Sequence, residues 1–302
     1  MNYISLCCDK NYLKYTKTLI YSIWKNNLSE KITICIFFGW EKEILLASWM
    51  KEVIESFWFT FKYYIFPDNI ANDLKTCTYL GKSTYYRLYI PQILLSRWVK
   101  KTLYLDVDII CNNNLMEIFK TNIENKLFAV AMENSKETFN CGVMYINVEE
   151  REKRALTDFL INYIETHPDK IIAGDQSAMN NTLKSSDYSL LDPRYNLSIQ
   201  YRYYRKQNTH YTKNYIKKEI TKWVLFHFNA KKKPRHYLCV HPKAYLWYKY
   251  KKNNNIKDFV MLVVNLIFSN LSNIIFKTQI INKLYNIKFF RKLFLLTVTW
   301  HK

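Results

Sequence analysis

Two aspartates in the stretch KTLYLDVDIICNNNL, residues 101–115, have the type and spacing that most directly suggest chemistry. Asp106 and Asp108 are one residue apart, and on an extended chain residues i and i+2 point to the same side. Two carboxylates on one side suit Mg²⁺ or Mn²⁺, hard cations that also bind the diphosphate of a nucleotide. A surface turn at a strand end, with both acids solvated, is the alternative. The apolar residues before the pair favour the metal site, because burying an acid pair without a cation is costly.

The elements that must position these acids alternate between strands and helices. We expect strands near residues 3–8, 32–38, 57–66, 103–105, 128–131, 143–148 and 223–228, and helices near 12–24, 41–55, 84–95, 149–165 and 175–183. Pro91 interrupts the third helix or marks a new start. Strands that alternate with helices of ten or more residues predict an α/β fold, with a mainly parallel sheet covered by helices on both faces. Ligands of such sheets bind beyond the carboxyl ends of the strands, which is where Asp106 and Asp108 lie.

The composition is that of a folded protein. The chain has 302 residues, of which 49% are hydrophobic, enough for one large domain or one domain with an appendage. The seven cysteines are odd in number and show no C-x-x-C spacing, so we expect the reduced cysteines of a cytosolic protein. The start MNYISLCCDK lacks the features of a signal peptide. The four glycines (Gly39, Gly81, Gly142 and Gly174) form neither G-x-G-x-x-G nor a P-loop, which excludes a glycine-rich phosphate cradle.

The positive charge is confined to the last third of the chain. Residues 1–200 carry 23 basic and 23 acidic residues, whereas residues 201–302 carry 22 and 2, which accounts for the net charge of +20. After the polar break at 251–255, apolar runs alternate with Lys and Arg, and Asp258 is the single acid. The 18 uncharged residues that follow Asp258 reach the lower length limit of a membrane span, but Asn and Ser interrupt them. We therefore expect a helical basic tail that lies in the membrane interface, with a true span and ordinary core helices as alternatives.

A basic chain with 25 tyrosines is also compatible with nucleic-acid binding through stacking and phosphate contacts. However, no nucleic-acid recognition motif is present, and the excess charge accompanies apolar rather than polar runs. We expect no nucleic-acid partner. A lipid-binding module without catalysis is the other alternative to an enzyme.

Six segments of the chain resemble one enzyme family. YLDVDIICNNNLMEIF, which contains the two aspartates, resembles the D-x-D segment of family 8 glycosyltransferases, the GT-A group of retaining nucleotide-sugar enzymes. The other five occur in the family's order over roughly residues 1–245: SLCCDKNYLKYTKTLIYSI, STYYRLYIPQIL, FNCGVMYINVEEREK, GDQSAMN and HFNAKKKPRH. The chain resembles in particular the bacterial galactosyl- and glucosyltransferases that build surface lipooligosaccharide. The resemblance implies a GT-A catalytic domain at 1–250, followed by a membrane-association region at 251–302.

The resemblance also implies which residues bind the metal and the nucleotide. Asp106, Asp108 and His227 would hold Mn²⁺ or Mg²⁺, and the His nitrogen favours Mn²⁺. Without the family, a satisfied core histidine at a strand end is the favoured interpretation of His227. Lys233 would reach the diphosphate, while its neighbours Lys231 and Lys232 are solvated or assist. The positions that match the family's nucleotide contacts are Asp9, Asn11, Tyr12, Arg87, Val107 and Lys233. The alternatives are helix capping by Asp9, a surface Tyr12 and a surface helix Arg87.

The same resemblance assigns residues to the transferred sugar. Arg87, Asn140, Asp175 and Gln176 match sugar-binding positions, and amides and acids suit hydroxyl groups because hydroxyls both donate and accept. Asp175 and Gln176 would be the catalytic pair, with Gln176 near the anomeric carbon. No carboxylate stands out as a nucleophile for double displacement, so we expect same-face attack, in which the departing phosphate oxygen takes the acceptor proton.

Three residues of the chain depart from the family pattern, and two of its glycines suggest close packing. The departures are Ala230 for a glycine, Cys141 for Ser or Ala, and Ser177 for an acid. Gly142 and Gly174 suggest close backbone packing at the site.

The function implied is transfer of galactose or glucose from a UDP-sugar to a hydroxyl of a glycan or glycolipid, such as lipooligosaccharide. Because the tail would bind anionic lipid, we expect a cytoplasmic protein that is peripheral on the inner face of the cell membrane.

Overall fold

The structure is a computed structural model, and it describes most of the first 251 residues. The described residues are 1–9, 12–39, 44–66, 74, 84–133, 138–198, 211–212, 214–215, 218, 221–229, 233–234 and 243–251. Nearly all of the predicted basic tail, residues 252–302, lies outside this part of the chain. Among the described helices, none is long and apolar enough to cross a membrane.

A seven-stranded sheet forms the centre of the molecule, in the order β3-β2-β1-β4-β7-β6-β8. Its first four members, β3, β2, β1 and β4, run parallel to one another, and β7 runs antiparallel to both β4 and β6. The strands are β1 (Asn2–Cys8), β2 (Ile32–Phe38), β3 (Thr60–Ile65), β4 (Lys101–Leu105), β6 (Phe128–Met132), β7 (Phe139–Asn147) and β8 (Tyr188–Leu190). Strand β2, ITICIFF, is buried at every position, as expected for a parallel strand that is covered on both faces.

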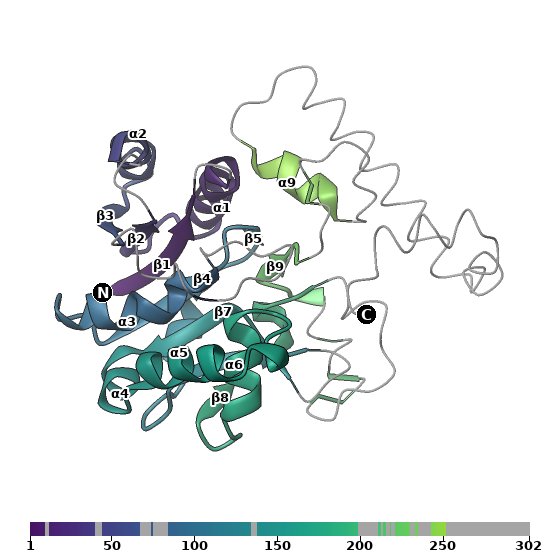
Figure 1. Cartoon of the computed structure of the whole chain (residues 1–302). Coiled ribbons are helices and arrows are strands. Elements are labelled where there is room, and N and C mark those ends of the chain that lie inside the picture. The colour runs from purple at the N-terminus through teal and green to yellow at the C-terminus, as the bar shows by residue number, and fades with distance from the viewer. Residues whose placement is uncertain are drawn as a thin grey trace, which may run out of the picture.

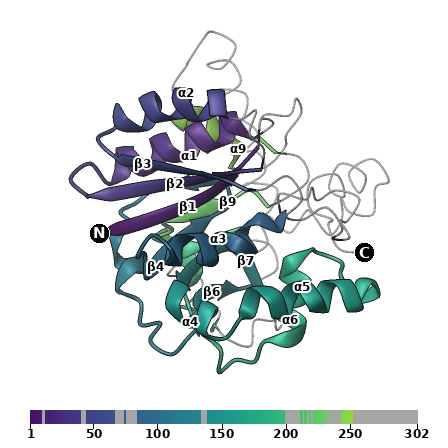
Figure 2. The same ribbon diagram turned by 60° about the vertical axis from the view of Figure 1, so that its left-hand side comes forward.

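Helices cover both faces of this sheet. Helices α1 (Leu13–Asn26) and α2 (Ile44–Glu55) lie on one face, and α3 (Tyr86–Leu95), α4 (Val148–Lys153) and α5 (Leu156–Thr166) lie on the other (Figures 1 and 2). Helix α1 is amphipathic, because its buried residues recur at helical spacing. Short helices complete the described chain: α6 (Asp175–Thr182), α9 (Ala244–Tyr250) and the 3-10 helices η3 (Met116–Lys120), η4 (Pro168–Lys170) and η5 (Pro193–Tyr195). The predicted fold, a mainly parallel sheet with helices on both faces, is confirmed.

The strand order places the carboxyl ends of β1 and β4 at a switch point. Strand β1 pairs with β2 on one side and β4 on the other, so the connections that leave β1 and β4 diverge. Open α/β sheets bind ligands at this kind of position. A second, two-stranded antiparallel sheet of β5 (Ile109–Cys111) and β9 (Leu225–His227) lies directly after the D-x-D segment. This small sheet brings a distant part of the chain to the switch point.

Several predicted elements were wrong in their boundaries. The single helix predicted at 149–165 is two helices, α4 and α5, separated by Ala155, whose left-handed backbone (φ 47°) breaks the hydrogen-bond ladder. The strand predicted at 57–66 begins only at Thr60, because Trp58 (φ 63°) forms a left-handed turn. Pro91 neither interrupts nor restarts α3 but lies buried inside it.

Other differences concern length. Strand β7 begins four residues earlier than predicted, at Phe139, and β9 is only three residues long. The short strands β5 and β8 and helix α9 were not predicted. Five of the cysteines are described, all of them free: Cys7, Cys8, Cys35, Cys111 and Cys141.

Candidate active site

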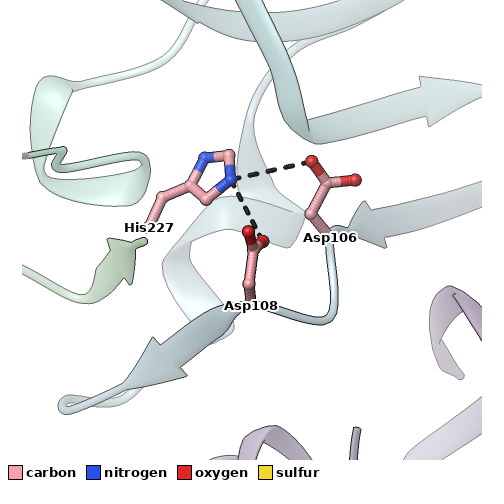
Figure 3. A group of neighbouring side chains, drawn as sticks. All are labelled: Asp106, Asp108 and His227. Atoms are coloured by element: carbon pink, nitrogen blue, oxygen red, sulfur yellow. Dashed lines mark ion pairs between the residues drawn. The ribbon is translucent and has the colours of Figure 1, made fainter. Parts of the chain in front are cut away.

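Asp106, Asp108 and His227 converge at the carboxyl end of β4, and we call them the metal cluster (Figure 3). One potential ligand atom from each residue lies within 4.8 Å of the other two. His227 Nε2 is 3.2 Å from Asp108 Oδ1 and 3.6 Å from Asp106 Oδ2. The side chain of Asp106 is the most accessible of the three, at 29% exposure, whereas His227 is nearly buried. The three residues that the sequence assigned to the metal are therefore brought together.

Local hydrogen bonding explains why these side chains meet. Asp106 directly follows β4, and its backbone N–H donates to Gly142 O of the neighbouring strand β7 at 2.8 Å. Asp108 lies immediately before β5, and Ile109 pairs with His227 in the β5–β9 sheet. The Phe228 N–H donates to Asp108 O at 3.0 Å. Antiparallel pairing thus holds the imidazole beside the aspartates.

Because Gly142 has no side chain, there is room beside it for His227 and Asp106 of the metal cluster. A Cβ atom at this position would lie 2.2 Å from His227 Cε1 and 2.9 Å from Asp106 Oδ2, closer than van der Waals contact permits. The predicted close packing at Gly142 is confirmed. Gly174 has a different requirement, because it precedes α6 with φ 59° and ψ −137°, a conformation that side chains disfavour.

Basic side chains balance the two aspartates. Lys233 Nζ forms a very short ion pair with Asp108 and donates to Phe228 O at 2.8 Å. Burial raises the pKa of Asp108, but the charge of Lys233 is the main influence that lowers it, and the pKa lies well below its ordinary value. Asp106 Oδ1 accepts from Arg87 Nη1 at 3.1 Å and from the Tyr104 hydroxyl at 2.7 Å.

Arg87, Asp175, Asn140, Gln176 and Glu133 form a second polar group beside the metal cluster, and we call it the sugar-side cluster after the expected role of its members. Arg87 Nε and Nη2 donate to the two oxygens of Asp175 at 2.5 and 2.8 Å, a bidentate pair in which both residues are buried. Burial lowers the pKa of Arg87, but Asp175 and Asp106 raise it by more. Burial raises the pKa of Asp175 above its ordinary value, although Arg87 opposes this shift.

Amide side chains make up the rest of the sugar-side cluster. Asn140 Nδ2 donates to Gln176 Oε1 at 3.2 Å and to Glu133 Oε1 at 3.3 Å. Gln176 Nε2 donates to the same Glu133 oxygen at 3.3 Å, while Gln176 Oε1 accepts from the Cys141 N–H at 3.1 Å. The four predicted sugar-binding residues, including Arg87 and Asp175, therefore lie together.

The predicted nucleotide-binding residues are only partly described. Asp9 follows β1, and its Oδ1 accepts from the Tyr12 N–H at 3.2 Å in the turn before α1, but the N-cap of α1 is Tyr12 and not Asp9. Tyr12 is half-buried, with its ring 5.6 Å from that of Tyr15. Val107 is buried between the two aspartates. Asn11 and residues 230–232, including Ala230, lie outside the described part of the chain.

Sequence reasoning missed three residues of this site. Tyr104 shares a strand face with Asp106, and the same i, i+2 rule that links the aspartates could have identified it. Glu133 is an acid that directly follows the apolar strand β6, as Asp106 follows β4. Asn196, whose Oδ1 lies 3.0 Å from His227 Nδ1, had no local signal.

The residues of the metal cluster fit a divalent cation. Two carboxylates and an imidazole form a mixed oxygen and nitrogen ligand set, which suits Mn²⁺ better than Mg²⁺ or Ca²⁺. A separation of up to 4.8 Å between ligand atoms is close to the distance across a metal ion with bonds of about 2.2 Å. In the described site, Arg87 and Lys233 balance the negative charges of Asp106 and Asp108, the same charges that a bound cation would balance.

The sheet, together with an acid pair and a histidine at its switch point, defines the GT-A class of fold. Comparison with solved structures agrees: a crystal structure of the galactosyltransferase LgtC in complex with donor and acceptor sugar analogues superposes with a TM-score of 0.72. That comparison covers 86% of this chain and 100% of LgtC at 15% identity, so it shows the fold alone. The chain belongs to glycosyl transferase family 8, whose family model matches residues 3–239. The family expected from the six sequence segments is confirmed.

Curated relatives agree with this assignment. A lipopolysaccharide 1,2-glucosyltransferase of Escherichia coli is 26% identical over 254 residues, 77% of this chain and 73% of that protein. The glycosyltransferase GlyE of Streptococcus pneumoniae is 24% identical over 259 residues, and the chain matches 80% of its own length but only 59% of GlyE. Family membership favours a glycosyltransferase over a nucleic-acid-binding or lipid-binding protein without catalysis.

Proposed function

We propose that the protein is a metal-dependent, retaining glycosyltransferase that moves galactose or glucose from a UDP-sugar to a hydroxyl of a glycan. The observation that carries the proposal is the metal cluster, which lies at the switch point of a GT-A sheet. The acceptor is lipooligosaccharide or another surface glycan. The similarity to a lipopolysaccharide glucosyltransferase and to the fold of a galactosyltransferase supports this class of acceptor and both sugars.

Glycosyl transfer places negative charge on the diphosphate as the bond to the sugar breaks, and stabilising that charge is what accelerates the reaction. A bound Mn²⁺ or Mg²⁺ supplies Lewis-acid stabilisation of this leaving group. Asp106, Asp108 and His227 would hold the cation. Lys233, which pairs with Asp108 in the described structure, would then be available to bind the diphosphate. The uracil and ribose are held by Asp9, Asn11 and Tyr12, with Val107 at the nucleotide as well.

The sugar-side cluster binds the hexose. Asp175 accepts from sugar hydroxyls, Arg87 holds the Asp175 carboxylate in place, and Asn140 supplies further hydrogen bonds. Gln176 lies on the acceptor side of the anomeric carbon. Arg87 donates to both oxygens of Asp175, which lowers their nucleophilicity but leaves each oxygen a lone pair for a sugar hydroxyl, and this argues against Asp175 as a nucleophile. Same-face attack, with the departing phosphate oxygen as the base, is therefore the mechanism that we propose.

The chain is divided into a catalytic domain at residues 1–250 and a basic membrane-association region at 251–302. The basic and apolar composition of the second region supports attachment to anionic lipid on the inner face of the cell membrane. An enzyme that acts on a glycolipid benefits from this location, because its acceptor is concentrated there.

The test is release of UDP from UDP-galactose and UDP-glucose, with Mn²⁺ and without acceptor. We expect slow UDP release by the wild-type protein, faster from UDP-galactose, and no release by the Asp106→Asn variant. A donor screen in the same assay identifies the sugar. Equal release by wild-type and Asp106→Asn protein would contradict the proposed function.

A further inference from the structure

We propose that Asn196 fixes the tautomer of His227, so that the bare nitrogen of the imidazole faces the two aspartates. The orientation of Asn196 is in turn set by a chain of amides that begins at the sugar-side cluster. The inference rests on the proposed function, because the bare nitrogen matters only if the metal cluster binds a cation. Asn196 is a positioning residue in this account, since it does not itself touch the cation or the substrate.

The chain of amides begins at two backbone N–H groups, which can only donate. The Gly142 N–H donates to Asn140 Oδ1 at 2.9 Å, and the Cys141 N–H donates to Gln176 Oε1 at 3.1 Å. These two contacts identify which atom of each amide is the oxygen. The Asn140 NH₂ group must then point the other way, toward Gln176 Oε1, where it lies at 3.2 Å. The orientations of Asn140 and Gln176 are therefore mutually consistent.

The orientation of Asn140 decides that of Asn196. Asn140 Oδ1, already an acceptor from Gly142, lies 2.9 Å from Asn196 Nδ2, so Asn196 must present its NH₂ group there. Asn196 Oδ1 then faces His227 Nδ1 at 3.0 Å. The backbone keeps the two residues in register, because the His227 N–H donates to Leu197 O at 2.9 Å. Each atom in this path acts only as a hydrogen-bond donor or only as an acceptor.

An amide oxygen can only accept, so His227 Nδ1 must carry the hydrogen. In the neutral imidazole, Nε2 is then left with a free lone pair, and this atom faces Asp108 and Asp106 at 3.2 and 3.6 Å. Without Asn196, the two carboxylates would favour a hydrogen on Nε2, which blocks metal binding. Asn196 and His227 are each only 3% exposed, so little water competes for the hydrogen bond.

The inference predicts an effect on cation binding from a residue outside the metal cluster. Because Asn140 orients Asn196, Asn140→Ala should weaken cation binding, although Asn140 makes no hydrogen bond to any residue of the metal cluster in the described structure. The sugar-side cluster and the metal cluster are thus coupled through this chain of amides, in addition to the ion pair between Arg87 and Asp106.

The first experiment measures Mn²⁺ affinity of the full chain by the electron paramagnetic resonance signal of free Mn²⁺. We expect Asn196→Ala to weaken binding about 10- to 100-fold, the range for groups that orient metal ligands. Asn196→Asp keeps an acceptor oxygen at Nδ1–H but places its second oxygen against Asn140 Oδ1, so its loss of affinity should be smaller than that of Asn196→Ala. The control Asn181→Ala removes an exposed asparagine of α6 and should leave affinity unchanged. Equal affinity of wild-type and Asn196→Ala protein would overturn the inference.

The second experiment reads the tautomer directly in the metal-free protein, by ¹⁵N nuclear magnetic resonance of the imidazoles. Wild-type His227 should show hydrogen on Nδ1, and Asn196→Ala should move it at least partly to Nε2. Hydrogen on Nε2 in the wild type would overturn the inference, even if a variant failed to fold. If the wild type binds no Mn²⁺, the proposed function fails, and this spectrum alone then decides the role of Asn196.

Discussion

The two polar clusters at the switch point differ in how their charges are satisfied. In the sugar-side cluster, both oxygens of Asp175 are engaged by a single guanidinium, and the amide groups pair with one another. In the metal cluster, Asp106 and Asp108 both approach Nε2 of His227 and rely on charges from Arg87 and Lys233. The first cluster is complete as the chain folds, whereas the second fits an additional cation.

Asp108 of the metal cluster and Asp175 of the sugar-side cluster are both buried, but their pKa values shift in opposite directions. Burial raises the pKa of each, but in Asp108 this is outweighed, chiefly by the charge of Lys233, and the pKa falls. In Asp175 burial outweighs Arg87, and the pKa rises. Asp108 thus lies in the more strongly positive environment. Its partner Lys233 can turn from Asp108 to an incoming diphosphate.

The largest effect is expected from removing charge in the metal cluster. Asp108→Asn should lower kcat/KM for UDP release about a thousandfold, because the developing charge on the diphosphate loses its stabilisation. Its stability should change little, since Lys233 can turn to solvent. The check is steady-state kinetics with saturating Mn²⁺. Activity within threefold of the wild type would remove the metal cluster from the account.

A smaller loss is expected in the sugar-side cluster. Asp175→Asn should lower kcat/KM about a hundredfold and destabilise the fold by about 3 kcal/mol, because the buried Arg87 loses its bidentate counter-ion and keeps only the single contact to Asp106. Mn²⁺ affinity should stay within twofold of the wild type. The double variant Arg87→Met, Asp175→Leu serves as the control, and should recover stability without activity. A matching loss of Mn²⁺ affinity in Asp175→Asn would show that the two clusters cannot be separated in this way.

The Gly142→Ala variant tests whether the metal cluster needs the space beside Gly142. The added Cβ would lie 2.2 Å from His227 Cε1, so the imidazole must move. We expect Mn²⁺ affinity to fall about tenfold, as measured by calorimetric titration, with the thermal unfolding midpoint as a check on folding. Unchanged affinity would mean that the ligand geometry is looser than the structure describes.

The smallest effect on activity is expected at Arg151 of α4. Arg151 is fully buried, and among the described residues its guanidinium nitrogens have no hydrogen-bond partner. Burial lowers its pKa to about 10, so it is still charged at pH 7. Arg151→Met should therefore raise the free energy of unfolding by about 1–3 kcal/mol, with activity unchanged.

Arg154, three residues later, provides the matched control for Arg151. Its guanidinium donates to Glu150 at 2.7 Å and to Asp187 at 3.0 Å, so Arg154→Met should be neutral or slightly destabilising. Urea unfolding at pH 7 measures both variants. Loss of stability in Arg151→Met would indicate that the arginine has a counter-charge or water that the described residues do not supply.

The sequence predicted well those elements whose signal is local. Strand β2 was placed at its observed residues because ITICIFF is a continuous apolar run. The break at Ala155 was missed, since no glycine or proline marks it. The turn at Trp58 was missed for a similar reason: an aromatic residue in a left-handed conformation contradicts the usual preference. The three-residue strands β5 and β8 were missed because they are too short to produce a periodic pattern.

The site was predictable to the extent that its residues belong to motifs. The D-x-D pair and the family resemblance identified Asp106, Asp108 and His227. Asn196 was not found, because its position beside His227 depends on a connection between η5 and β9 that no local pattern encodes. Glu133 was overlooked although it follows a strand in the same way as Asp106. Contacts between segments distant in sequence remain the part that requires a structure.

The central claim is that a divalent cation, held by the metal cluster, binds the diphosphate of the donor. The most direct measurement is calorimetric titration of the purified full chain with UDP, with and without Mn²⁺, for the wild type and for His227→Ala. We predict tight binding only with Mn²⁺ in the wild type and weak, Mn²⁺-independent binding in His227→Ala. Equal UDP affinity in all four titrations would contradict the account.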